Sequence, residues 1–162
     1  MERDAPKIIW LNGAINSGKT ATAKELQKLV PKTAHVEVDS LNAFIDWMPL
    51  EDSIPIDLDN AVAVARVFVS HGLNVVVTYP LSTICYERVL QRAALPVRFF
   101  TLRPSLEICL LDRGQRLLSD WERQRISFHY DGGINLDIGV VIDNSYLTGT
   151  ECAAKILALA AD

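Results

Sequence analysis

Residues 13–20 read GAINSGKT and follow the apolar run IIWL at 8–11, with only Asn12 between them. The octet fits G-x-x-x-x-G-K-[ST], the phosphate-binding P-loop, and a preceding strand is the context that this motif requires. In a P-loop, inward-facing backbone N–H groups surround a polyphosphate, and a helix begins there with the positive end of its dipole. Apolar residues at helical spacing after Thr20, ended by Pro31, predict that helix. The chain is therefore expected to bind a nucleotide, rather than to match the motif by chance in a helix-capping loop.

Four residues of the octet have a specific expected role. Gly13 and Gly18 allow backbone torsions and close approach that a Cβ would obstruct. Lys19 is expected to reach the β- and γ-phosphates, and the Thr20 hydroxyl to ligate Mg²⁺. The residues predicted to hold the nucleotide are Gly13, Ala14, Ile15, Asn16, Ser17, Gly18, Lys19 and Thr20.

Composition predicts one globular domain spanning residues 1–162. Of these residues, 49% are hydrophobic and 22% charged, which suits a single core. The net charge of −4 disfavours a nucleic-acid partner, since phosphate-backbone binding depends on clustered Lys and Arg. No apolar stretch approaches the roughly 20 residues that span a bilayer, and the charged start MERDAPK lacks the apolar core of a signal peptide. We expect a cytoplasmic protein without a membrane partner. The sequence does not indicate whether the protein forms oligomers.

Short apolar runs alternate with amphipathic segments along the chain. The runs at 8–11, 34–38, 75–78, 97–102 and 139–142 are typical of strands buried on both faces. Helical patterns occupy 58–71, 83–92, 105–119 and 150–160, and the least regular stretches are 44–57 and 120–137. This alternation predicts an α/β fold in which helices flank a mostly parallel sheet, the three-layer arrangement of P-loop proteins. In such folds ligands bind at the carboxyl ends of the strands.

Asp39 is the strongest candidate outside the P-loop. It ends HVEVDS, the second predicted strand, and is expected to emerge beside the P-loop. Its carboxylate could accept the proton of a substrate hydroxyl during phosphoryl transfer, or hold Mg²⁺ through water. Alternatively, Asp39 with Ser40 caps a following helix at LNAFIDWM, and the two roles are compatible.

The third predicted strand ends without the acid that many P-loop proteins carry there. VVVTYP offers Thr78 and Tyr79 in place of a Walker B carboxylate. Either Asp39 takes over the magnesium role, or catalysis is impaired. A motor-type ATPase is disfavoured for this reason, and a GTPase because the sequence has no N-K-x-D run for reading guanine.

Arginines cluster downstream in DRGQR and WERQR. The spacing predicts Arg113 and Arg116 on one helical face, followed by Arg123 and Arg125. In small-molecule kinases such a cluster folds over the nucleotide as a lid and neutralises the transferred phosphoryl group, and here we expect the lid at 117–137. The alternative is a solvated helix face paired with the neighbouring acids Asp112, Asp120 and Glu122.

Several motifs at matching spacings carry a family resemblance. They are L-N-G-A-I-N-S-G-K-T after the first strand, V-D-S-L about twenty residues later, R-G-Q-R, and a strand ending in Asp143 before an alanine-rich helix. Over most of its length the chain resembles chloramphenicol phosphotransferase and its relatives among the shikimate-kinase-like P-loop kinases. The resemblance implies a five-stranded parallel sheet in the order 2-3-1-4-5, ATP with Mg²⁺ as cofactors, and phosphorylation of a hydroxyl on a small molecule. It also implies that Asp39 is the catalytic base, that Arg113 and Arg116 are lid arginines, and that Asp143 and Asn144 contact adenine.

The leading hypothesis is an ATP-dependent kinase for a small hydroxylated molecule. We expect the acceptor to bind against the segment 41–57 and the end of the third strand. The predicted contacts are Phe44, Trp47, Asp57 and Tyr79. Phe44 and Trp47 stand at helical spacing, so they could instead be core side chains.

Two other functions stay open. A nucleotide-binding sensor or regulatory module that keeps the P-loop without efficient chemistry would be consistent with Thr78. A nucleoside or nucleotide kinase is a nearer alternative, although the segment 41–58 has few basic residues to hold an acceptor phosphate.

Overall fold

The computed structural model describes residues 7–112 and 116–161. At its centre lies a five-stranded sheet in which every neighbouring pair of strands is parallel, with the order β2-β3-β1-β4-β5. The strands are β1 Ile8–Asn12, β2 Thr33–Glu37, β3 Asn74–Thr78, β4 Val97–Leu102 and β5 Val140–Ile142. The α/β fold predicted from the alternating pattern and the strand order implied by the family resemblance are both confirmed.

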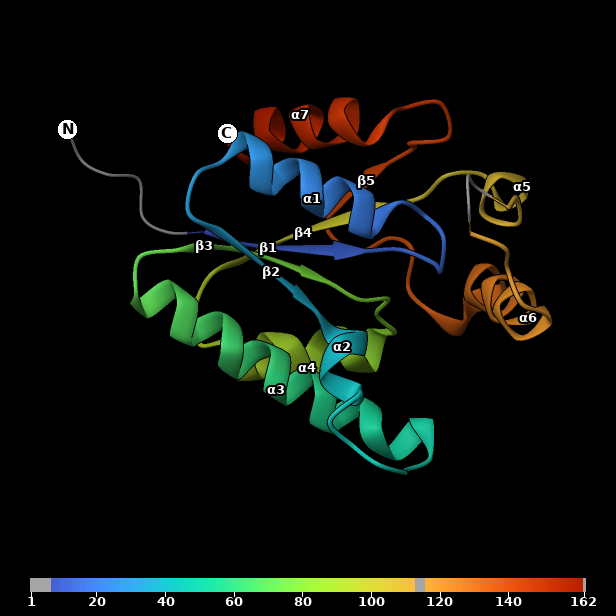
Figure 1. Cartoon of the computed structure of the whole chain (residues 1–162), viewed down its shortest axis with the longest axis horizontal. Helices are drawn as coiled ribbons and strands as arrows, with labels where there is room; N and C mark the ends of the chain where they lie inside the picture. Colours follow the sequence, from blue (N-terminus) through green and yellow to red (C-terminus); the bar gives the residue numbers. More distant parts are fainter. Residues whose placement is uncertain (1–6, 113–115, 162) are drawn as a thin grey trace.

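Helices cover both faces of the sheet (Figure 1). On one face lie α1 (Lys19–Leu29) and α7 (Gly149–Ala160), and on the other lie α3 (Leu50–Ser70) and α4 (Thr83–Ala93). The short helices α2 (Val38–Asn42), α5 (Leu106–Cys109) and α6 (Asp120–Phe128) lie toward the carboxyl ends of the strands, and a π-helical turn, η1 (His129–Gly133), continues α6. No helix in the described part of the chain is long and apolar enough to cross a membrane.

The side chains of β1 divide the core into two layers. Ile8 and Trp10 pack in the cluster formed with α3 and α4, whereas Ile9 and Leu11 pack in the cluster formed with α1 and α7. Successive residues of a strand point to opposite faces, so a strand covered on both sides must be apolar throughout. This is why residues 8–11 of β1 are all apolar, and Asn12 is the one polar residue of this strand.

Helix α3 begins earlier than the apolar periodicity predicts. The pattern indicated a helix over 58–71, but the helix occupies Leu50–Ser70 and includes Pro55. Pro49 stands immediately before the first turn, and two acids in that turn favour the positive end of the helix dipole. Pro55 removes one backbone hydrogen bond, and the remainder of the helix is held by the core cluster beneath it.

The helix expected over 105–119 is replaced by two short helices. Helix α5 ends at Cys109, and α6 starts at Asp120, inside the stretch that the pattern left irregular. Ser119 and Glu122 form a capping box, in which each side chain accepts the backbone N–H of the other residue. A capping box begins a helix, so the chain cannot run as one helix through this point.

The second strand ends one residue before the predicted boundary. It stops at Glu37, and Val38 already belongs to α2, so the helix expected at LNAFIDWM lies earlier in the sequence. Asp39 stands in the first turn of α2 rather than at its N-cap, and its side chain does not cap the helix. The capping alternative is therefore wrong for this residue, which leaves its carboxylate available to the site.

Candidate active site

The loop between β1 and α1 has the backbone of a phosphate cradle. Gly13 and Gly18 have φ angles of 147° and 96°, in the region that favours glycine. A Cβ on Gly13 would lie 2.6 Å from the carbonyl oxygen of Leu102, so a larger residue does not fit there. Helix α1 begins at Lys19 with no side-chain hydrogen bond at its N-cap. Its first-turn N–H groups are thus available to an anion, as the sequence motif predicts.

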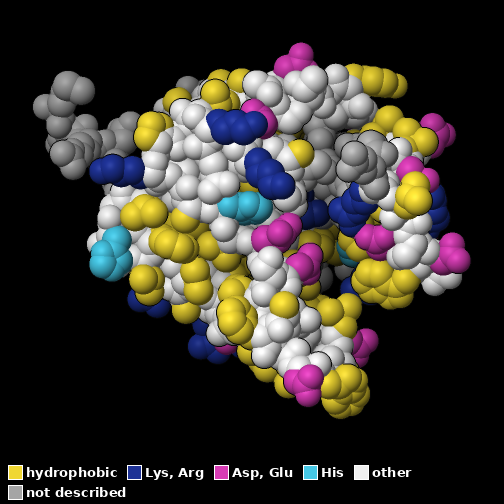
Figure 2. Space-filling model, viewed as in Figure 1, with side chains coloured by type: hydrophobic (Ala, Val, Ile, Leu, Met, Phe, Trp, Pro, Cys, Tyr) yellow, Lys and Arg dark blue, Asp and Glu magenta, His cyan; other side chains and the backbone are white. Residues whose placement is uncertain are grey.

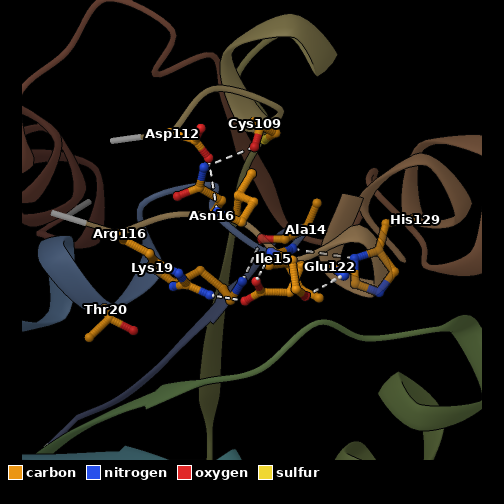
Figure 3. Close-up of polar contacts among 12 residues, drawn as sticks. Ala14, Ile15, Asn16, Lys19, Thr20, Cys109, Asp112, Arg116, Glu122 and His129 are labelled. Carbon is orange, nitrogen blue, oxygen red and sulfur yellow. Dashed lines mark hydrogen bonds and ion pairs between the residues drawn. The ribbon is translucent and has the colours of Figure 1, made fainter. Parts of the chain in front are cut away.

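Contacts from outside the loop hold the cradle in shape (Figure 3). The amide Nδ2 of Asn16 donates to the carbonyl oxygens of Cys109 and Leu111, both at 2.9 Å. The backbone N–H of Ile15 donates to Nδ1 of His129 at 3.3 Å. The segments around α5 and η1 therefore fix the loop before any ligand binds, which lowers the ordering cost of binding.

The residues that follow β5 support the phosphate cradle from outside. Asn144 is 7% exposed, and its Nδ2 donates to the carbonyl oxygen of Ser17 at 2.8 Å. Asp143 accepts hydrogen bonds from the backbone N–H and the hydroxyl of Ser145. Neither residue lines the cavity described below. The adenine contact expected of Asp143 and Asn144 stays a prediction.

Lys19 is directed along the inside of the loop (Figure 3). Its Nζ donates to the carbonyl oxygens of Gly13 and Ala14, at 2.8 and 2.7 Å. Burial is the main reason that the pKa of Lys19 is lowered to about 8, and the carboxylate of Asp39 is the largest influence opposing it. A polyphosphate beside this ammonium would favour its charged form.

Glu37 is a site residue that the sequence reasoning did not assign. The hydroxyl of Thr20, the expected magnesium ligand, donates to Oε1 of Glu37 at 2.8 Å. The strand register sets Glu37 opposite Thr78, and both line the same cavity. The end of β2 therefore carries a carboxylate beside the place on β3 where the Walker B acid is missing. The available signal was the acid inside HVEVDS, one residue before the end of a predicted strand.

Asp39 lies at the solvent-accessible rim of the same cavity. Its pKa is raised, first by partial loss of solvent and then by the carboxylates of Glu37 and Asp57, while Lys19 pulls in the opposite direction. A raised pKa makes a carboxylate a better proton acceptor. The position and chemistry of Asp39 thus suit the role of a general base.

One cavity of about 500 Å³ brings most of these groups together. It lies between the carboxyl ends of the strands and α6, which belongs to a lobe formed by residues 116–133. Figure 2 shows acidic and basic side chains gathered at this hollow. The lining residues that the argument uses are Lys19, Thr20, Glu37, Asp39, Leu50, Thr78, Tyr79, Arg116, Trp121, Arg125 and His129. The phosphate cradle and the predicted base therefore share a single chamber.

The predicted acceptor contacts are only partly brought together. Tyr79 lines the cavity, but Phe44 and Trp47 are 87% and 81% exposed and do not line it. Their exposure also excludes the alternative that they are core side chains. Asp57 is buried, and its Oδ2 accepts a hydrogen bond of 2.8 Å from Asn42. Leu50 lies in the predicted acceptor segment and Trp121 in the predicted lid, and both supply apolar surface to the cavity, although neither was named as a contact.

The arginines have different surroundings. Arg116 lines the cavity and forms an ion pair of 2.6 Å with Glu122 (Figure 3). Arg123 pairs with Asp112, so both arginines pair with acids that the solvated-face alternative named, although Arg116 also lines the cavity. Arg113 lies outside the described residues, so its expected role as a lid residue stays a prediction.

Comparison with solved structures finds the same fold in several proteins. The tunicamycin resistance protein of Deinococcus radiodurans has a TM-score of 0.70 and 21% identity, over 96% of this chain and 95% of that chain. The APS kinase of Mycobacterium tuberculosis, in complex with AMPPNP and APS, has a TM-score of 0.72 and 16% identity, over 99% and 100%. A gluconokinase from Sinorhizobium meliloti 1021 has a TM-score of 0.66 and 16% identity, over 96% and 92%.

No family model and no curated protein matches the chain. At sequence identities of 16–21%, a structural likeness establishes the fold alone. The chain therefore has the three-layer fold of the P-loop small-molecule kinases, and the resemblance predicted from GAINSGKT, VDSL and RGQR is confirmed at that level.

Proposed function

We propose that this chain is a P-loop kinase that transfers the γ-phosphoryl group of ATP to a hydroxyl group of a small molecule. The observation that supports this most is the shared cavity, which holds the cradle and Lys19 together with the Asp39 carboxylate. Phosphoryl transfer depends mainly on positioning and on charge stabilisation, because the protein itself forms no covalent bond. The fold, which is that of P-loop small-molecule kinases, supports the same assignment.

Each group has a role in the proposed transfer. The cradle N–H groups and Lys19 bind the β- and γ-phosphates. Asp39 accepts the proton of the acceptor hydroxyl. At the same time the hydroxyl oxygen bonds to the γ-phosphorus, and the bond between that phosphorus and the ADP oxygen breaks. Arg116 stabilises the charge on the migrating group.

The residues around Thr20 fit a magnesium ion. Thr20, Glu37 and Asp39 present oxygen atoms, which are the ligands that Mg²⁺ prefers. The described residues contain no group of three or more His, Cys, Asp or Glu side chains that could hold a metal ion alone. Mg²⁺ does not require one, since it is commonly bound by one or two carboxylates together with substrate phosphates. When bound, the ion would neutralise charge on the phosphates.

ATP turnover with a panel of hydroxylated metabolites, nucleosides and antibiotics tests the proposal. On a true acceptor we expect Lys19→Ala to abolish transfer and Asp39→Asn to lower kcat by about 100-fold or more, because each removes an interaction made in the transition state. Glu87→Gln is the matched control, since Glu87 is exposed on α4, does not line the cavity and lies outside the predicted acceptor segment. Full activity in Asp39→Asn would show that Asp39 is not the base.

A second candidate is a nucleotide-binding regulatory module without efficient chemistry. It is favoured by Thr78, which stands where a Walker B acid is expected. Calorimetry that shows ATP binding, combined with neither transfer to any acceptor nor hydrolysis, would support this candidate. The cytoplasmic location and the lack of nucleic-acid or membrane partners stay predictions from composition.

A further inference from the structure

One face of α6 and of the turn that follows it lines the cavity. Trp121, Arg125 and His129 recur at four-residue intervals along α6 and the turn that follows it, and all three line the cavity. His129 is uncharged at neutral pH, because burial lowers its pKa to about 3. Arg125 is therefore the charged group of this face.

Arg125 has no carboxylate partner among the described residues. Its guanidinium carbon lies 4.6 Å from the centre of the Phe128 ring, a contact that orients the side chain without neutralising it. By contrast, Arg116 and Arg123 each pair with a carboxylate, at 2.6 and 2.9 Å. A charge in a partly enclosed site is stabilised when a ligand supplies the opposite charge.

Arg125 and Arg116 line the same cavity, and each influences more than one of its groups. Burial is the main cause of the lowered pKa of Lys19, and Arg116 adds to that lowering. Burial is also the main cause of the raised pKa of Tyr79, and there Arg125 is the cation that opposes the rise. Arg116 also opposes the rise that burial causes in the pKa of Asp39, and Arg125 adds to the lowering that burial causes in the pKa of His129. Arg125 is therefore close both to the predicted acceptor contact Tyr79 and to His129.

We propose that Arg125 binds an anionic oxygen group of the acceptor, so that the substrates are hydroxylated organic acids, with a carboxylate as the simplest case. This inference rests on the proposed kinase function and names its substrate class. The planar guanidinium matches a carboxylate with two parallel hydrogen bonds. Leu50, Tyr79 and Trp121 add apolar surface to the same cavity for the carbon skeleton, and Asp39 takes the hydroxyl.

Two titrations by calorimetry test the role of Arg125 in the full-length protein. The first adds AMPPNP with Mg²⁺, which fills the cradle and keeps small anions out of it. The second adds matched pairs of a hydroxy acid and its primary amide to the nucleotide-saturated protein: glycerate with glyceramide, and mandelate with mandelamide. Within a pair only the charge and the second oxygen differ, so the difference in affinity reports on an anion-binding group.

We expect at least one acid to bind about tenfold more tightly than its amide. Arg125→Gln should remove that preference, and Arg125→Lys, which keeps the charge but loses the planar fork, should retain part of it. Arg123→Gln is the matched control on the same helix and should retain all of it, because Arg123 is paired with Asp112 and does not line the cavity.

The proposal is overturned if no pair shows an acid preference, including the case in which no compound binds, or if the preference survives in Arg125→Gln. A weaker affinity of Arg125→Gln for AMPPNP would also overturn it, because the guanidinium would then belong to the phosphates. The proposed kinase function is tested separately, by the first titration and by ATP turnover with the same acids. A protein that selects acids through Arg125 but never phosphorylates them contradicts only the kinase function.

Discussion

At the scale of single residues, His129 is a buried base in contact with the phosphate cradle. It is 2% exposed, and its Nδ1 accepts the N–H of Ile15. Burial, with smaller contributions from the charges of Lys19 and Arg125, lowers its pKa to about 3. Since a histidine in an unfolded chain titrates near ~6.5, below that pH the unfolded chain binds a proton that the folded chain does not. Stability therefore falls as the pH drops from about 6.5 toward 3.

Urea unfolding at pH 7 and pH 5 tests this effect. Protonation of His129 in the unfolded chain should lower the free energy of unfolding by about 2 kcal/mol at pH 5. His129→Gln keeps an acceptor for the Ile15 N–H but has no such proton, so its stability should change less between the two pH values. His71→Gln is the control, because His71 is exposed at the end of α3. Equal pH dependence in His129→Gln and wild type would contradict the assignment.

Glu37 makes the second prediction at this scale. If its carboxylate helps Thr20 to hold Mg²⁺, Glu37→Gln should raise the Mg²⁺ concentration needed for half-maximal nucleotide binding by about tenfold, the usual scale for loss of a supporting carboxylate. Glu37→Asp should lose less, because it keeps the charge. The measurement is AMPPNP titration at a series of Mg²⁺ concentrations. An unchanged requirement would show that Glu37 only orients the Thr20 hydroxyl.

The site was predictable where it depends on adjacent residues and less so where it depends on packing. The cradle follows from one continuous octet, and Asp39 from the end of a strand. Glu37 depends on the register that sets it opposite Thr78, and Arg125 on the side of α6 that faces the cavity. Neither can be read from local spacing. Phe44 and Trp47 were expected at the site because they lie in the predicted acceptor segment, but they are exposed and lie outside the cavity.

At the scale of helices, the wrong start of α3 and the wrong helix over 105–119 have a common origin. Apolar periodicity located the parts of α3 and α4 that pack on the sheet, since those positions repeat with the helical period. The first turns of α3 and the whole of α6 extend beyond the sheet, so the core does not impose that period on them. Their start signals are local: Pro49 and the two first-turn acids for α3, and the capping box at Ser119 for α6.

The two capping boxes should have different consequences when they are removed. Ser119→Ala and Thr148→Ala each delete an N-cap hydrogen bond of 3.1 Å, which typically costs about 1 kcal/mol. Helix α7 packs in the main core, so Thr148→Ala should lower the free energy of global unfolding by that amount. Helix α6 lies at the edge of the fold, so Ser119→Ala should mainly speed hydrogen exchange of the α6 amides. Equal acceleration throughout the molecule in Ser119→Ala would show that α6 unfolds only with the core.

At the scale of the whole molecule, the parallel sheet was predictable from few rules, whereas its strand order was implied by the family resemblance. Five apolar strands separated by helices favour parallel pairing through right-handed crossovers, and these rules still allow more than one strand order. The cavity, in contrast, is formed by segments distant in the sequence: the cradle, the start of α2 and α3, and the lobe that carries α6. Its volume and lining depend on how these segments meet, which periodicity does not encode.

Because the cradle joins β1 to α1 within one core, nucleotide binding should stabilise the entire chain. A ligand at a hundredfold excess over its Kd adds about 2.7 kcal/mol, which corresponds to a rise in Tm of roughly 5–10 °C for a domain of this size. Thermal unfolding with AMP, ADP and AMPPNP in the presence of Mg²⁺ measures the effect. ADP and AMPPNP should stabilise the wild type and AMP should do so much less, because the cradle binds phosphates beyond the first. Lys19→Ala should abolish the difference between ADP and AMP, and equal stabilisation by AMP in the wild type would show that another part of the nucleotide dominates binding.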